Sequence, residues 1–292
     1  LVAKLSFLLK LPTPRLEAQR FSFFPAGKVS LNPRDGGMGL DAMLAAAERN
    51  ACSRTLIVAF SGGATNKIGL ARLEFRRILS DPSAPTADAD QLYVLDPTGM
   101  SFYEHDLANF TDQLRRACEP YTRVVLLGNC MGATAALRFS ALLSSPRDVV
   151  LAFNPEVNPR LDPRKPFRIA AKLSPRQTSA LPGVLRNAVH TTPARVLVHS
   201  SAWKPEYDQG QLLPLPNTGT EVVVEGTDAK AVATALQRGA HARVLRLVFR
   251  ECREHGMLAK VLRGSGALRE ILDRSVTDSG GYRLLDQRDS NK

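Results

Sequence analysis

Five residues, Gly128-Asn-Cys-Met-Gly132, stand between an apolar run and an alanine-rich stretch, and they constrain the fold more than any other part of the chain. The apolar run at 123–127 predicts a buried strand, and residues 133–143 predict a helix. A chain that passes from strand to helix over so few residues has to turn sharply, and glycines on both sides leave room for that turn. We therefore expect Cys130 to sit in a strained backbone conformation with its thiol at the tip of the turn.

Other strand and helix signals alternate along the chain. Near-continuous apolar runs predict strands at 55–60, 91–95, 148–153, 194–199, 221–225 and 243–249. Periodic stretches predict helices at 40–50, 70–79, 107–118, 228–237 and 255–262. This alternation predicts an α/β fold with a mostly parallel central sheet and helices on both faces. A strand, a G-x-nucleophile-x-G turn and a helix in this setting are typical of the α/β-hydrolase fold.

Length and composition favour one domain over two. The chain has 292 residues, of which 44% are hydrophobic and 23% charged, and it can bury one large core. We expect an irregular N-terminal extension over 1–50, the α/β domain over 51–276 and a disordered polar tail over 277–292. The segment 156–193 is rich in proline and arginine and only weakly periodic, and we expect a cap or lid there.

The net charge of +11 raises the question of nucleic-acid binding. The positive residues are mostly arginines spread along the whole chain, and neither a zinc finger nor an aromatic-interleaved RNA motif accompanies them. We therefore expect a small-molecule acyl substrate rather than a nucleic acid as the partner. The apolar run at 5–9 is too short to span a membrane, so no membrane span is predicted. The oligomeric state is left open.

The cysteines argue for a reducing compartment, with a cytoplasmic location as the default. They lie at positions 52, 118, 130 and 252. This spacing contains no C-x-x-C pair, which argues against a zinc knuckle and against a thioredoxin-type motif. We predict no metal ion and no organic cofactor.

A nucleophile at position 130 needs a base, and in this fold the chain order is nucleophile, acid, histidine. Four histidines follow Cys130, at positions 190, 199, 241 and 255. The histidine at 199 lies inside a predicted strand, and those at 190 and 241 precede strands, at the wrong edge of the sheet. His255 follows the last predicted strand and begins the final helix, so we predict that it is the base.

Three carboxylates compete for the role of the acid that orients His255. Asp208 follows the strand that ends near residue 199 and is the best placed, and Glu206 is close behind it. Asp228 takes the role if the strand at 221–225 fills the penultimate place in the sheet. Asp228 also fits an ordinary helix N-cap.

The developing oxyanion would need two backbone N–H donors. Met131 follows the nucleophile at the start of a predicted helix, where the helix dipole also favours negative charge. Gly62 or Gly63, in the turn after the strand at 55–60, would supply the second donor. A thiol at a helix N-terminus beside an imidazole ionises readily and is a strong nucleophile, so attack on a carbonyl would give a thioester.

Over residues 55–273 the chain resembles members of the α/β-hydrolase superfamily. In that fold the turn that carries the nucleophile is called the nucleophile elbow, and here it corresponds to Gly128-Asn-Cys-Met-Gly-Ala133. This segment is similar to the Gly-Asn-Ser-Met-Gly-Gly elbow of a poorly characterised bacterial group. The other similar segments are Phe60-Ser-Gly-Gly63, Asp96-Pro97 with Tyr103 and His105, Ala152-Phe-Asn-Pro155, and His255 with Leu262-Arg-Gly-Ser-Gly266. Two residues depart from the pattern: Cys130 replaces serine and Ala133 replaces the second glycine. Dienelactone hydrolases and polyhydroxyalkanoate synthases are similar in using cysteine at the elbow.

Motif and resemblance together imply a hydrolase or acyl-transfer enzyme that acts on an ester or thioester. Cys130 would be the nucleophile, His255 the general base and Asp208 the orienting acid. The alternative is a catalytically inactive α/β-hydrolase fold that serves as a binding or scaffold protein, in which Cys130 is a small buried residue.

Overall fold

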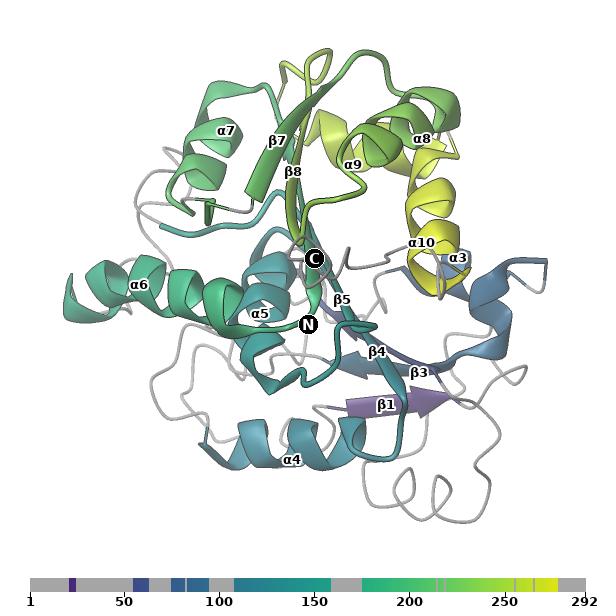
Figure 1. Cartoon of the computed structure of the whole chain (residues 1–292), viewed down its shortest axis with the longest axis vertical. Coiled ribbons are helices and arrows are strands. Elements are labelled where there is room, and N and C mark those ends of the chain that lie inside the picture. The colour runs from purple at the N-terminus through teal and green to yellow at the C-terminus, as the bar shows by residue number, and fades with distance from the viewer. Residues whose placement is uncertain are drawn as a thin grey trace, which may run out of the picture.

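The computed structural model is built around an eight-stranded sheet with the strand order β1-β3-β2-β4-β5-β6-β8-β7 (Figure 1). The structure describes residues 21–24, 55–62, 75–81, 83–94, 108–158, 175–213, 215–217, 219–254, 256–264 and 266–277. The strands are β1 Phe21–Phe24, β2 Thr55–Phe60, β3 Asp90–Val94, β4 Arg123–Asn129, β5 Val149–Phe153, β6 Arg195–Ser201, β7 Gly219–Val224 and β8 Val244–Phe249. The helices are α3 Arg76–Leu79, α4 Ala108–Cys118, α5 Met131–Phe139, α6 Pro175–Thr191, α7 Lys204–Gln211, α8 Ala229–Arg238, α9 Met257–Gly264 and α10 Ala267–Thr277.

Seven of the strands run parallel, which confirms the predicted sheet. These seven strands pair with one another in parallel register, as Phe60 does with Gly128 and Phe153 with His199. The exception is β1, which pairs antiparallel with β3 at one edge and lies inside the N-terminal extension, where no strand was predicted over 21–24. Parallel strands end at one edge of the sheet, here called the carboxyl edge, and this is where sites form in open α/β sheets.

Apolar side chains on each face of the sheet form a separate core, because alternate residues of a strand point to opposite faces. One core joins the sheet to α4, α5 and α6, and it includes Leu126, Leu137 and Leu185. The other joins it to α8, α9 and α10, and it includes Leu127 and Ile271. Figure 1 shows these two groups of helices on opposite sides of the strands. Because both faces are covered, the strands read as apolar runs and not as alternating ones.

The segment in which we expect a cap contributes a core helix. Its second half forms α6, whose Leu181, Leu185 and Val189 are buried in the first core. Pro182 lies within this helix, which explains why its periodicity is hard to see in the sequence. The first half of the segment beyond residue 158, the helix predicted at 40–50 and the tail beyond residue 277 lie outside the described residues.

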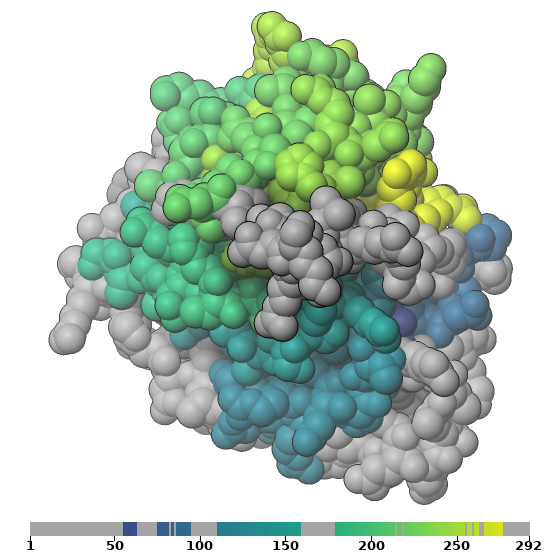
Figure 2. All heavy atoms as spheres, viewed as in Figure 1, coloured from purple at the N-terminus to yellow at the C-terminus, as the bar shows by residue number. Residues whose placement is uncertain are grey.

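The strands and helices that follow β6 are coloured in lighter green and fill the upper half of the space-filling view (Figure 2). The teal residues around α4 lie in its lower half. None of the helices among the described residues combines the length and the apolar character needed to cross a membrane.

Candidate active site

Cys130 occupies the turn between β4 and α5 with φ 56° and ψ −116°, a combination that strains a residue with a side chain. Its backbone is held at both ends. The Cys130 N–H donates to the carbonyl of Phe153 over 2.8 Å, and the Thr134 N–H donates to the Cys130 carbonyl over 3.2 Å. The predicted sharp turn at the end of the elbow strand is therefore present.

The glycines on both sides of Cys130 are required by close backbone contacts. A Cβ atom at Gly128 would lie 2.1 Å from the carbonyl oxygen of Gly132. A Cβ atom at Gly132 would lie 2.4 Å from the carbonyl oxygen of Phe60, the last residue of β2. Since neither distance is tolerable, the two glycines let the first turn of α5 fold back onto the ends of β4 and β2.

The thiol of Cys130 contacts the carboxylate of Glu156, a residue that the sequence did not single out. Cys130 Sγ donates to Glu156 Oε2 over 3.4 Å, and Glu156 is only 4% exposed. Thr134 on α5 fixes the backbone of Glu156, since its hydroxyl donates to the Glu156 carbonyl over 2.7 Å and accepts from the Glu156 N–H over 3.1 Å. The helix that begins directly after Cys130 thus also places the carboxylate of Glu156.

The loop that carries Glu156 is anchored at both ends. Asn154 adopts a positive φ of 47°, and its side-chain oxygen accepts from the Ser201 N–H over 3.0 Å. On the far side, Gln209 of α7 accepts from the N–H groups of Val157 and Asn158 over 2.8 and 2.7 Å, and its amide donates to the Asn158 carbonyl over 2.6 Å. This loop is tied to the end of β6 and to α7.

The three candidate acids have different partners. Asp208 forms an ion pair with Lys204 over 3.2 Å, and its side chain is 43% exposed. Glu206 is turned inward: its carboxylate accepts from the hydroxyl of Ser201 and, over 3.2 Å, from the N–H of Gly256. Gly256 directly follows His255, so Glu206 reaches the loop that carries the predicted base.

Asp228 is an N-cap. Its side chain accepts from the Ala231 N–H over 2.8 Å at the start of α8. The strand before it, β7, lies at the edge of the sheet, while β8 is the neighbour of β6. The condition under which Asp228 would be the acid is therefore not met.

The predicted oxyanion donors lie on neighbouring elements. Met131 is the first residue of α5, and Gly62 comes two residues after the end of β2. Because β2 and β4 pair in parallel with Phe60 opposite Gly128, both residues lie at the same part of the carboxyl edge. Gly63 and the predicted base His255 lie outside the described residues.

His199 is fully buried in β6 beside this edge. Its ring stacks on Phe153 with the centroids 4.4 Å apart, and Phe249 lies on its other side at 6.3 Å. Burial lowers the pKa of His199 to about 3, although the nearby backbone of Ala152 acts against that shift. An imidazole that stays neutral in an apolar setting is poorly suited to take up a proton at neutral pH.

The surroundings of two other cysteines, Cys252 and Cys118, make their thiols harder to ionise and therefore less reactive. Burial, together with the nearby charges of Glu206 and Glu251, raises the pKa of the Cys252 thiol to about 11. Burial and the charge of Asp148 raise the pKa of the Cys118 thiol to about 12. In the part of the chain that the structure describes, no three His, Cys, Asp or Glu side chains are grouped so that they could hold a metal ion.

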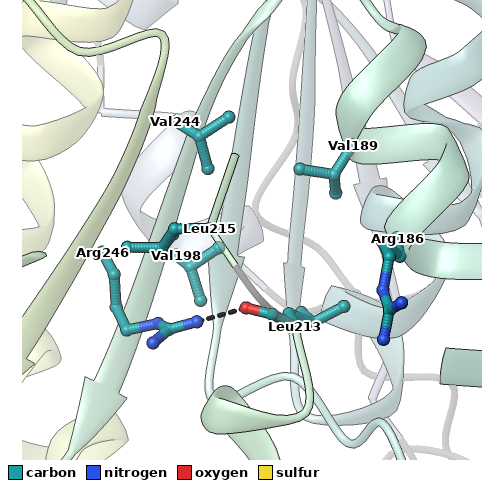
Figure 3. A pocket seen from close by; sticks show the side chains of 7 residues that line it. All are labelled: Arg186, Val189, Val198, Leu213, Leu215, Val244 and Arg246. Atoms are coloured by element: carbon teal, nitrogen blue, oxygen red, sulfur yellow. Dashed lines mark hydrogen bonds between the residues drawn. The ribbon is translucent and has the colours of Figure 1, made fainter. Parts of the chain in front are cut away.

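A small hollow lies between α6 and the sheet, and Cys130 is not among the residues that line it (Figure 3). It is bordered by Val189, Val198 and Val244, and Arg246 on its wall donates to the carbonyl of Leu213. Its volume of about 10 Å³ is room for no more than one water molecule. This hollow cannot hold an acyl substrate.

Neither a protein-family model nor the sequence of a curated protein matches the chain. Solved structures resemble it at low identity. The fluorophosphonate-binding serine hydrolase FphF of Staphylococcus aureus is 11% identical with a TM-score of 0.45, over 89% of this chain and 93% of that one. The capsule O-acetyltransferase of Neisseria meningitidis serogroup A is 11% identical with a TM-score of 0.43, over 72% and 84%. The S-formylglutathione hydrolase of S. aureus is 9% identical with a TM-score of 0.40, over 77% and 81%.

The fold of the chain is identified by its own sheet and by the turn at Cys130. Its parallel sheet is covered on both faces, and the strand at the centre of that sheet ends in a sharp G-x-C-x-G turn that opens a helix. This arrangement is the α/β-hydrolase fold.

Proposed function

We propose that this protein is an acyl-transfer enzyme, a hydrolase or an acyltransferase, that acts on an ester or thioester through Cys130. The observation that carries the proposal is the strained backbone of Cys130 at the carboxyl edge, with its thiol in contact with a buried carboxylate 3.4 Å away. Strain of this kind persists where the surroundings over-determine it, and it gathers at functional sites. A buried structural cysteine would need neither the strain nor the carboxylate.

The proposed reaction begins when Cys130 Sγ attacks the carbonyl carbon of the acyl group. The thiol proton passes to the base, and the oxyanion of the tetrahedral intermediate accepts hydrogen bonds from the backbone N–H groups of Met131 and of Gly62 or Gly63. The leaving alcohol or thiol departs with the proton held by the base, and a thioester remains on Cys130. Water or another acceptor then attacks this thioester and returns the thiol.

For the orienting acid we favour Glu206 over Asp208. Support comes from the directions of the two side chains: Asp208 pairs with Lys204 on the surface, whereas Glu206 accepts from the backbone N–H next to His255. Both follow β6, the strand after which the acid is expected. In this assignment Glu206 fixes the loop and the ring of His255, and His255 takes the thiol proton.

Glu156 is a rival for the role of base, since it already accepts a hydrogen bond from the thiol. The substitution Glu156→Gln separates the two assignments, because glutamine keeps the size of the side chain but cannot take up the proton. If His255 is the base, as we propose, Glu156→Gln retains ester hydrolysis within about tenfold, while His255→Ala loses on the order of 10³-fold in kcat. The reverse pattern would assign the base to Glu156.

The proposal is tested with chromogenic acyl esters and thioesters. We expect Cys130→Ala to lose on the order of 10³-fold or more in kcat/KM, because no nucleophile remains. Cys118→Ala is the matched control: that residue ends α4, away from the carboxyl edge, and its variant should keep full activity. Alkylation of Cys130 no faster than that of a free thiol, with no turnover above background in wild type or in Cys130→Ala, would favour the scaffold alternative.

A further inference from the structure

Ser201, the last residue of β6, contacts two separate parts of the candidate active site. β6 lies between β5 and β8, and Ser201 is fully buried where this strand ends. Its backbone N–H donates to the side-chain oxygen of Asn154 over 3.0 Å, and its hydroxyl donates to the carboxylate of Glu206. One serine thus bonds to the loop after β5 and to α7.

The bond to Asn154 holds Ser201 itself in place. Asn154 has a positive φ of 47°, which is uncommon for a residue other than glycine. Its N–H donates to the carbonyl of His199 over 2.7 Å, while its side-chain oxygen accepts from Ser201. These two bonds tie Asn154 to the end of β6 at two points, so the backbone that carries the Ser201 hydroxyl is fixed.

The bond to Glu206 fixes the direction of a carboxylate. Glu206 lies in the first turn of α7, and one of its oxygens accepts from the Ser201 hydroxyl. The other oxygen accepts from the N–H of Gly256 over 3.2 Å. Hydrogen bonds to an ionised acceptor are among the stronger ones in proteins. The carboxylate therefore links the end of β6 to the loop after β8, and Ser201 is one of the donors that hold it there.

The neighbouring residue, Ser200, shows what a buried hydroxyl does without such a bond. Ser200 is also fully buried, and it too packs against α7, since a Cβ atom added at Gly210 would lie 2.7 Å from its oxygen. Its hydroxyl has no hydrogen-bond partner among the described residues. Two adjacent serines of equal burial, both against the same helix, thus differ in whether the hydroxyl holds a carboxylate.

We propose that Ser201 is a positioning residue of the proposed reaction and acts by orienting Glu206. This inference rests on the proposed function and on Glu206 as the orienting acid. Ser201 does not contact the acyl group in this account. Without the hydroxyl, Glu206 keeps its charge but loses a donor that fixes its direction, so the base is held less often in the productive geometry. The consequence is a lower kcat, with the binding of the acyl ester unchanged.

The test compares Ser201→Ala with Ser200→Ala as the matched control, using chromogenic acyl esters. We expect Ser201→Ala to lower kcat on the order of tenfold with little change in KM, because only the orientation of the acid is lost. Ser200→Ala should keep the wild-type kcat. A wild-type kcat in Ser201→Ala, or an equal loss in both variants, would overturn the proposal.

A double-mutant cycle separates positioning of Glu206 from a general structural effect. In the Glu206→Ala background the Ser201 hydroxyl has no carboxylate to orient. We therefore expect Ser201→Ala to change kcat by no more than about twofold in that background. A similar loss of kcat in the wild-type and Glu206→Ala backgrounds would show that Ser201 acts independently of Glu206, and this would overturn the proposal.

The same variants distinguish failure of this inference from failure of the proposed function, because their Tm values need no turnover. Ser201→Ala should lower Tm on the order of 5 °C, since Glu206 loses a donor, and Ser200→Ala should not lower it. In the Glu206→Ala background the loss from Ser201→Ala should disappear. Absence of turnover in wild type would contradict the proposed function, and with it the role of Ser201 in that reaction. Additive losses of Tm would instead overturn the hold of Ser201 on Glu206, whether or not the protein turns over an ester.

Discussion

At the scale of single residues, Cys130 combines a strained backbone with a neighbour that the sequence could not reveal. A conformation of this kind costs about 1–3 kcal/mol, and the hydrogen bonds at both ends of the residue help to hold it. The strain was predictable, because two glycines around a central residue between strand and helix allow little else. Glu156 was not predictable, because it lies in a loop without periodicity and no spacing connects it to Cys130.

His199 provides a prediction about stability. Its pKa falls from 6.5 to about 3 on folding, so the unfolded chain binds a proton below pH 6.5 that the folded chain does not. The stability associated with the neutral ring is therefore present above pH 6.5 and is lost as the pH falls toward 3. Between pH 7 and pH 5 the loss from this one group is about 2 kcal/mol.

The measurement is urea unfolding of wild type and His199→Leu at both pH values. We expect the variant to lose about 2 kcal/mol less than wild type between pH 7 and pH 5. The raised pKa of Asp148 acts in the opposite direction in both proteins and cancels in the comparison. An equal loss in the two proteins would show that His199 is protonated in the folded state.

At the scale of elements, the sequence predicts best those strands that are buried on both faces. The runs at 55–60 and 243–249 became β2 and β8 with nearly the same bounds, because covered parallel strands need apolar residues at every position. Among the elements that were not predicted, β1 and α6 escaped for different reasons. β1 is a strand of only four residues at the edge of the sheet, and α6 contains Pro182, which signals a break that its packing on the sheet overrides.

The short helix α7 connects the two carboxylates of the site. Glu206 on this helix binds the loop after β8, and Gln209 binds the loop that carries Glu156. We expect Gln209→Ala to lower the unfolding free energy by about 1–3 kcal/mol, because the N–H groups of Val157 and Asn158 lose their acceptor. We also expect kcat to fall by no more than the roughly tenfold limit set for Glu156→Gln, with little change in KM, since the loop would no longer hold Glu156 at Cys130.

The control for this prediction is Gln211→Ala on the same helix, because Gln211 is exposed and bonds only to Glu221 among the contacts described for its side chain. That variant should match wild type in stability and kcat. The positioning role of Gln209 is contradicted if Gln209→Ala loses stability but keeps the wild-type kcat and the wild-type pH dependence of Cys130 alkylation.

At the scale of the whole molecule, the sheet separates two chemically different edges. The carboxyl edge gathers Cys130, Glu156 and Glu206, while the opposite edge gathers arginines at strand starts and helix ends. The parallel sheet and the location of Cys130 at its carboxyl edge were predictable from the order of apolar runs. The placement of β7 outside β8 was not, because two similar strand–helix units in a row do not show which one returns to the centre.

The central claim is that Cys130 carries the acyl group during the reaction. The most direct test is mass spectrometry of the full chain after rapid quenching with an activated acetyl ester, followed by mapping of the modified peptide. The account predicts one acetyl group per chain, located on Cys130, absent from Cys130→Ala and unchanged in Cys118→Ala. Turnover of the ester by Cys130→Ala at the wild-type rate, with no acetyl group on Cys130 in wild type, would contradict it.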